Sequence, residues 1–170
     1  EFIQREIPYV FIGGTSLMKS AHVRDVLALL RAARSFKDDL AWMRYLQLWP
    51  GIGPKTAEKI VSAILASDAT NALDVLVQRL GQGHPGVIGY KHLLKTATVP
   101  QKALEIAIQT LAPVMETRYD RWQYRKKDLE LLVTVAERYK SLVEFIDAFT
   151  LEPMTNTQID RLEAEDVVTM

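Results

Sequence analysis

Residues 48–59, LWPGIGPKTAEK, place two prolines and two glycines within five positions, between two segments whose apolar residues recur at helical spacing. Gly51 and Gly53 have no Cβ, so the backbone can turn tightly here and come close to a ligand. Pro54 suits the first position of a helix, where its missing N–H would have no partner. The pattern predicts a helix-hairpin-helix at about residues 38–66, in which Ile52 points back between the two helices.

The start of the second helix in this pattern predicts an anion-binding site. The first N–H groups of a helix have no partner within the helix, and the helix dipole adds to their attraction for an anion. A DNA phosphate fits such a site, and contacts of this kind position a duplex without reading its sequence. The predicted DNA-binding residues are Gly51, Ile52, Gly53, Lys55, Thr56 and Lys59. An ordinary helix corner with solvated lysines is the alternative interpretation.

The spacing of apolar residues along the rest of the chain predicts a mainly α fold, a helical bundle with a short β-strand at each end. Helices are expected at residues 21–34, 38–49, 54–66, 69–80, 100–119, 126–139, 142–149 and 157–164. Strands are expected at residues 7–12 and in the last residues, 165–170. Pro113 is expected to kink or end its helix. Residues 81–89, GQGHPGVIG, break the helical pattern, and their glycines indicate a flexible loop.

Composition limits the classes of function. The chain has 170 residues, enough for one domain with a sizeable core, and its 21 basic and 21 acidic residues cancel. Zero net charge argues against an overall basic nucleic-acid binder but leaves room for a local basic patch. The chain has no cysteine, no apolar run long enough for a membrane span and no signal peptide, and a cytoplasmic location is expected. Because residue 1 is not methionine and the last strand is cut short, we expect a piece of a longer protein.

No catalytic constellation is visible in the sequence. There is no G-x-x-x-x-G-K-[ST] phosphate loop, so this chain alone should not hydrolyse ATP. His22, His84 and His92 lack the spacing of metal ligands, and His22 is expected to be structural or at the surface. No catalytic residue, metal site or cofactor is therefore predicted within the chain itself.

Residues 118–127, RYDRWQYRKK, combine five basic residues with Tyr119, Trp122 and Tyr124. Basic residues interleaved with aromatic ones can hold single-stranded nucleic acid by charge and stacking. The alternative is a solvated helix face whose aromatic side chains turn into the core, which the position beside a helix junction favours.

Several stretches, taken in order, resemble the UvrD/Rep/PcrA type of superfamily 1 DNA helicase. They are residues 7–31 (IPYVFIGGTSLMKSAHVRDVLALLR), 38–46 (DDLAWMRYL), 50–60 (PGIGPKTAEKI), 128–153 (DLELLVTVAERYKSLVEFIDAFTLEP) and 165–170 (EDVVTM). The resemblance implies that residues 1–20 are the edge of a RecA-like motor domain, residues 21–164 the helical accessory subdomain called 2B, and residues 165–170 the returning motor strand.

The same resemblance implies a function. In that family the subdomain grips the duplex ahead of the fork and swivels to regulate unwinding, and the resemblance implies 3′-to-5′ polarity in the parent enzyme. The parent would use ATP and Mg²⁺, and the partners of this piece would be double-stranded DNA or a duplex/single-strand junction and the remaining helicase domains. Arg24 and Asp25 match a basic-acidic pair at the motor boundary, with a purely structural pair as the alternative.

The chain also departs from the family pattern. Many members carry two aromatic residues and an arginine where this chain has Leu17, Met18 and Ser20, which removes the contacts those residues would make. Two other functions stay open at this point. One is a free-standing helix-hairpin-helix module serving DNA repair, and the other is a protein-interaction or autoinhibitory domain.

Overall fold

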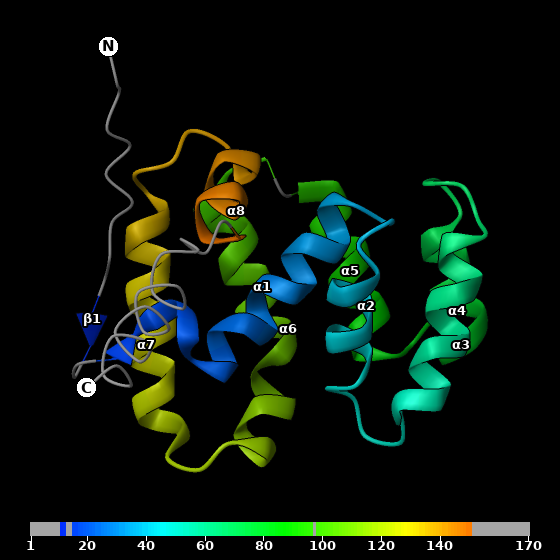
Figure 1. The fold of residues 1–170 in the computed structure, drawn as a ribbon, viewed down its shortest axis with the longest axis horizontal. Helices are drawn as coiled ribbons and strands as arrows, with labels where there is room; N and C mark the ends of the chain where they lie inside the picture. The colour runs from blue at the N-terminus through cyan, green and yellow to red at the C-terminus, as the bar shows by residue number, and fades with distance from the viewer. Residues whose placement is uncertain (1–10, 13–14, 97, 151–170) are drawn as a thin grey trace, which may run out of the picture.

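The computed structural model describes residues 11–12, 15–96 and 98–150, and these are mainly helical (Figure 1). The described helices are α1 (Ala21–Arg34), α2 (Asp39–Leu46), α3 (Pro54–Leu65), α4 (Ala72–Leu80), α5 (Pro85–Thr96), α6 (Pro100–Arg118), α7 (Trp122–Ala136) and α8 (Leu142–Thr150), preceded by the short 3-10 helix η1 (Leu17–Lys19). The predicted mainly α fold is confirmed.

The N-terminal β-structure is small in the described part of the chain. The strands β1 (Phe11–Ile12) and β2 (Thr15–Ser16) pair antiparallel, with Phe11 opposite Ser16. Most of the strand predicted at residues 7–12, the helix predicted at 157–164 and the strand predicted at 165–170 lie outside the described residues.

Helix α1 forms the centre of the fold. Figure 1 shows it crossing the middle of the molecule, with α7 and α8 toward one end and α3 and α4 toward the other. It contacts α2, α5, α6, α7 and α8. Val23, Val26, Leu29 and Leu30 are completely buried, because a helix surrounded by others must be apolar on most of its circumference.

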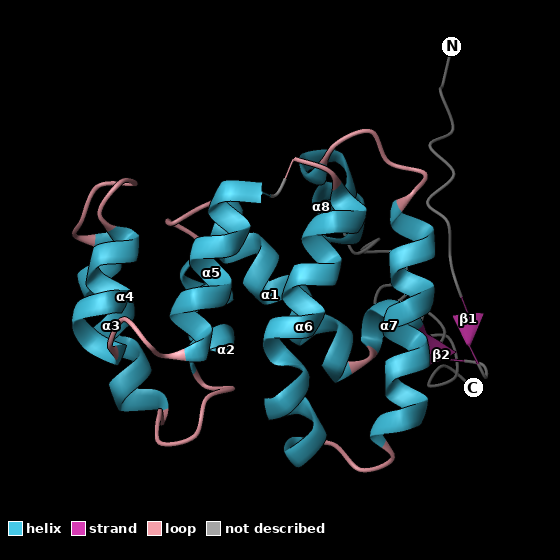
Figure 2. Ribbon diagram, turned by 180° about the vertical axis from the view of Figure 1, so that it is seen from behind, coloured by secondary structure: helices cyan, strands magenta, loops and turns pink. Residues whose placement is uncertain are grey.

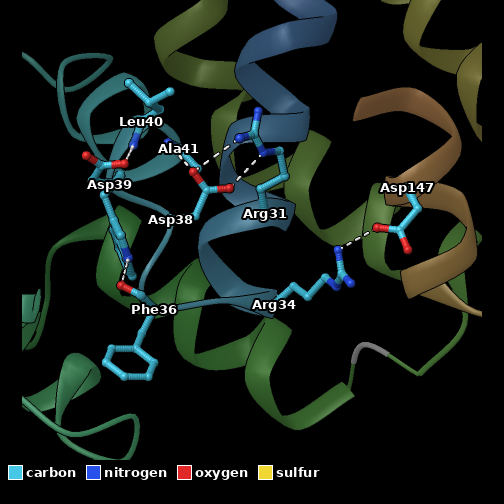
Figure 3. Close-up of polar contacts among 9 residues, drawn as sticks. Arg31, Arg34, Phe36, Asp38, Asp39, Leu40, Ala41 and Asp147 are labelled. Carbon is cyan, nitrogen blue, oxygen red and sulfur yellow. Dashed lines mark hydrogen bonds and ion pairs between the residues drawn. The ribbon is translucent and has the colours of Figure 1, made fainter. Parts of the chain in front are cut away.

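The connection from α1 to α2 is fixed by polar contacts (Figure 3). The Asp38 carboxylate accepts two hydrogen bonds from Arg31, at 2.9 and 3.1 Å, and caps α2 by accepting the N–H of Ala41 at 3.0 Å. Such a cap satisfies an N–H that has no partner within the helix. Farther along α1, Arg34 donates to Asp147 of α8 at 2.7 Å. These contacts set the direction in which α2 leaves the central helix.

The loop predicted across residues 81–89 is wrong in its second half, because α5 begins at Pro85. Gly86 and Gly89 are buried inside this helix, where close packing leaves no room for a larger side chain. A Cβ on Gly86 would lie 2.8 Å from Trp49 Cε2 and from the Tyr45 hydroxyl oxygen, and a Cβ on Gly89 would overlap the side chain of Thr110. These two glycines are therefore contact residues between helices rather than turn residues.

The predicted helix ends differ from the structure at several places. Helix α6 continues through Pro113 to Arg118, so the proline does not end the helix, and its exposed position lets water reach the carbonyl that it leaves unpaired. Helix α7 begins at Trp122 rather than at residue 126, α4 begins at Ala72 rather than at 69, and α2 ends at Leu46 rather than at 49.

Candidate nucleic-acid interface

The turn between α2 and α3, residues 47–53, has the geometry that its sequence predicts. The N–H of Ile52 donates to the carbonyl of Trp49 at 3.2 Å, which closes a four-residue turn. Pro50 is held at negative φ by its ring, and Gly51 has φ +81°, a combination typical of a type II turn. Only Gly51 in this turn needs the conformational freedom of glycine, because side chains disfavour positive φ.

Gly53 serves a different purpose. Its φ of −83° and ψ of 177° are accessible to any residue, and no heavy atom lies within 4 Å of the position that a Cβ would occupy. The missing side chain therefore leaves open space in front of the first turn of α3. Gly53 is the N-cap of that helix, and its carbonyl accepts the N–H of Ala57 at 2.9 Å.

The first N–H groups of α3 are open to solvent. Within the described residues, no acceptor contacts the N–H of Gly53, Lys55 or Thr56, and Pro54 has no N–H. All four residues are exposed, so a ligand can reach these donors from solvent. A helix start of this kind attracts an anion through its N–H groups and its dipole together.

The opposite side of the turn is anchored in the core. Trp49 and Ala57 are buried, and Ile52 is half-buried and packs against the core, as predicted. On α3, Ile60 and Ile64 continue the buried face. The free N–H groups are thus presented by a backbone that packing holds in place, which lowers the entropy lost when a ligand binds.

Two lysines flank the free donors. Lys55 and Lys59 are exposed and lie one helical turn apart, so both are on the same side of α3. Neither has an ion-pair partner in the part of the chain that the structure describes, although the exposed Glu58 lies between them in sequence. Five of the six residues predicted from the LWPGIGPKTAEK pattern are exposed at the turn and along the start of α3, whereas Ile52 packs against the core. The exposed arrangement suits binding of an anion rather than catalysis.

A second glycine pair offers a comparison. Gly81 (φ +93°) and Gly83 precede α5 as Gly51 and Gly53 precede α3, and both are exposed. At α5, however, the ring nitrogen Nδ1 of His84 accepts the N–H of Gly86 at 3.1 Å. The start of α5 is therefore capped by its own loop, whereas the start of α3 is not.

Asp25 lies away from this turn and is buried, with 2% of its surface exposed. Its carboxylate accepts a hydrogen bond from Arg44 Nε at 2.8 Å and another from the Tyr119 hydroxyl at 2.5 Å. Burial, followed by the hydrogen bond and the negative charge of Asp25, raises the pKa of Tyr119 to about 12. These contacts join α1, α2 and the end of α6, which favours the structural interpretation of Asp25 over a contact with another domain.

Arg24, the other member of the predicted pair, is exposed. Its Nε donates to the carbonyl of Met18 at 3.3 Å, in the short helix η1. Arg24 is exposed whereas the neighbouring Asp25 is buried, and neither residue belongs to the α2–α3 turn.

His22 is a structural residue that the sequence identified only as one of two alternatives. It is 2% exposed, and its Nε2 lies 2.9 Å from Asp128 of α7, while its Nδ1 lies 3.2 Å from Arg125 Nη1. Arginine can only donate, so Nδ1 must be the acceptor and the proton of the neutral ring is on Nε2, facing Asp128. Burial lowers the pKa of His22, Arg125 adds to that effect, and Asp128 opposes it.

The lowered pKa of His22 predicts that acid destabilises the fold. The unfolded chain binds a proton at its ordinary pKa of about 6.5, and the folded chain binds one only at lower pH. The stabilisation that His22 contributes is therefore complete above about pH 6.5, and it is lost as the pH falls through the lowered pKa of His22 in the folded chain. We expect the urea midpoint to fall between about pH 7 and pH 5, and His22→Gln should reduce that slope.

Acid should also destabilise the fold through His84, because burial lowers the pKa of His84 as well. The exposed His92 supplies the control, and His92→Gln should keep the wild-type slope. An unchanged slope in His22→Gln would show that His22 is not the group responsible.

The described residues contain neither a metal site nor a helix that could span a membrane. No three His, Asp or Glu side chains there lie close enough together to hold a metal ion. None of the described helices has the length and apolar character of a membrane span.

The chain is 28% identical over 170 residues to the ATP-dependent DNA helicase Rep of Escherichia coli (strain K12), an alignment that covers 92% of this chain. The chain is similar to DNA helicases. The ATP-dependent DNA helicase PcrA of Staphylococcus epidermidis is 23% identical over 175 residues, covering 98% of the chain. These alignments span only 25% and 22% of the relatives, so the chain corresponds to about a quarter of their length. No protein-family model and no solved structure matches.

The predicted resemblance to this helicase type is confirmed by these relatives. The assignment to the 2B subdomain and the domain limits at residues 20 and 164 stay predictions.

Proposed function

We propose that this chain is the accessory 2B subdomain of an ATP-dependent DNA helicase and that it binds the backbone of double-stranded DNA through the α2–α3 turn as a helix-hairpin-helix. The observation that supports this most directly is the open start of α3, where exposed N–H groups without an acceptor in the described residues lie beside Lys55 and Lys59. The similarity to Rep and PcrA over almost the whole chain supports a DNA phosphate as the ligand of those groups.

The chemistry of this site is binding without catalysis. A phosphate oxygen accepts the N–H groups of α3, the two lysines add charge, and no side chain reads a base. Affinity should be weak and dependent on salt, on the order of 10⁻⁴ to 10⁻⁶ M near physiological ionic strength. In the parent helicase, ATP and Mg²⁺ would act in domains outside this piece. Within the parent helicase, this subdomain would hold the duplex ahead of the fork and would regulate unwinding through its orientation relative to the ATP-using domains.

Two experiments, one on the gene sequence and one on DNA binding, separate the proposed function from a free-standing repair module and from a protein-interaction domain. A phosphate-loop sequence upstream in the same gene is expected for a helicase and not for a free-standing repair module. A protein-interaction domain would show no affinity for duplex at either of two salt concentrations.

Gly53→Ala should weaken duplex binding by about tenfold, the size expected when hydrogen bonds to a charged group are lost. The added methyl group occupies the open space that a phosphate would enter, and it causes no strain because φ is −83° and no atom lies within 4 Å. Fluorescence anisotropy with a blunt labelled duplex measures the affinity, and circular dichroism measures the fold.

Gly83→Ala is the matched control, since Gly83 is also exposed, has open space around it and has no positive φ. It should bind duplex as the wild type does. In Lys55→Gln and Lys59→Gln, the slope of log K against log salt should become shallower by about 0.9 for each phosphate contact removed. Equal affinity of the Gly53→Ala and Gly83→Ala variants for duplex DNA would show that the α2–α3 turn does not bind the duplex.

A further inference from the structure

The corner between α6 and α7 carries a second group of cations, which the α2–α3 site does not include. The exposed basic residues of this corner are Arg118, Arg121, Lys126 and Lys127. None of the four has an ion-pair partner in residues 15–96 or 98–150, although the carboxylates of Glu116 and Asp120 are exposed nearby in sequence. We call these residues, together with Tyr124, the basic corner.

The three aromatic residues of this segment have separate environments. Trp122 is buried, and Tyr119 is half-buried against Asp25, so both belong to the core side of the corner. Tyr124 is 70% exposed, and Lys127 Nζ lies 5.7 Å from the centre of its ring. One aromatic ring is thus presented to solvent among cations, and the other two are structural.

The stability of the local backbone does not explain why basic residues occupy the corner between α6 and α7. The non-glycine residue Arg121 has φ +54°, the left-handed conformation that side chains disfavour. Arg121 is also the N-cap residue of α7, at the helix end where the dipole favours negative charge. This cation is therefore placed against the local preference of the backbone.

The basic corner lies at the same end of the molecule as the α2–α3 turn. Arg118 Nη1 donates to the carbonyl of Gln47 at 3.5 Å, and Gln47 directly follows α2. Figures 1 and 2 show the α6–α7 loop and the α2–α3 loop at the same lower edge, seen from opposite sides. A DNA molecule bound at the α2–α3 turn can therefore extend along this edge and reach the basic corner.

We propose that the basic corner binds single-stranded DNA where it leaves the duplex, with a base stacked on Tyr124 and the backbone neutralised by Arg121 and Lys127. An exposed ring flanked by cations fits an unpaired base, because a duplex offers no free base face except at its ends. The inference rests on the proposed function and extends it from a duplex to a junction between duplex and single strand.

The test compares a blunt labelled duplex with the same duplex carrying an oligo-dT tail, both titrated with the 170-residue chain. The wild type should bind the tailed probe about tenfold more tightly, the contribution of a stacked base. Tyr124→Ala should abolish that preference and keep the affinity for the blunt duplex. Leu40→Ala is the matched control, because Leu40 is 71% exposed on α2, and it should keep both affinities.

Arg121→Gly separates binding from folding. Glycine relieves the left-handed conformation, so the variant should be at least as stable as the wild type while its preference for the tailed probe falls. A loss of preference together with retained stability supports the proposal.

The outcomes also distinguish this proposal from the proposed function. Gly53→Ala should weaken blunt and tailed probes by the same factor, whereas Tyr124→Ala should weaken only the tailed probe. Binding of free oligo-dT, lost in Tyr124→Ala, without any binding of blunt duplex would overturn the duplex function and keep the single-strand site. Equal affinity of the wild type for both probes, or displacement of the tailed probe by polyglutamate as readily as by oligo-dT, would overturn the single-strand site.

Discussion

Gly89→Ala should destabilise the chain by about 2 kcal/mol, even though alanine is the better helix former by about 1 kcal/mol. Gly89 lies inside α5 where that helix packs on α6, and a Cβ there would overlap the Cγ2 and Oγ1 atoms of Thr110. Thr110 cannot easily turn away, because its hydroxyl donates to the carbonyl of Ile106 at 2.7 Å. The two helices must separate or the threonine must leave its rotamer, and the urea midpoint should fall accordingly.

A second substitution tests this mechanism. Thr110→Ala removes the two atoms nearest to the added methyl group but keeps the Thr110 Cβ, 2.8 Å from it, so the Gly89→Ala/Thr110→Ala double variant should recover part of the lost stability. Additive effects of the two substitutions would contradict the described packing of α5 on α6. Gly83→Ala, in open space outside the helix, should change the midpoint little.

The same glycines explain why the sequence pattern does not predict the start of α5. A stretch such as GQGHPGVIG contains turn-forming and contact-forming glycines, and local pattern does not distinguish them. Gly81 has φ +93° and does form a turn, whereas Gly86 and Gly89 are required by Trp49 and Thr110, which lie far away in the sequence. Without those partners, three glycines and a proline in six residues predict a loop.

The α2–α3 turn was predictable because its causes are local. The proline and positive-φ glycine of the turn, and the open helix start after it, are separated by only a few residues. The contacts of Asp25 with Tyr119 and of His22 with Asp128 join residues about a hundred positions apart, so no local pattern predicts these partners. The sequence nevertheless contains a signal that these residues are structural. Asp25 and His22 interrupt an otherwise apolar face of α1, and a buried polar group needs a hydrogen-bond partner.

Asp25→Ala should be the most destabilising substitution in the polar contacts of α1, by about 3 kcal/mol. The buried carboxylate accepts a hydrogen bond from Arg44 of α2 at 2.8 Å and one from Tyr119 at the end of α6 at 2.5 Å. Tyr119 lies in turn below the Arg125 guanidinium, 4.9 Å from the ring centre. Alanine removes the acceptor for both donors and leaves a cavity beside the central helix. Arg44 can regain water because 38% of its side chain is exposed, so most of the cost comes from Tyr119 and from the cavity.

Tyr119→Phe provides the graded control, since it removes one hydrogen bond, keeps the ring and should cost about 1 kcal/mol. Asp25 also fixes α2 relative to the α6–α7 corner, because it bonds to side chains from both. At a temperature where Asp25→Ala is still folded, the preference for a tailed over a blunt duplex should therefore fall, while Tyr119→Phe should retain more of it. Urea unfolding of Asp25→Ala with a wild-type midpoint would show that this carboxylate does not hold the helices together.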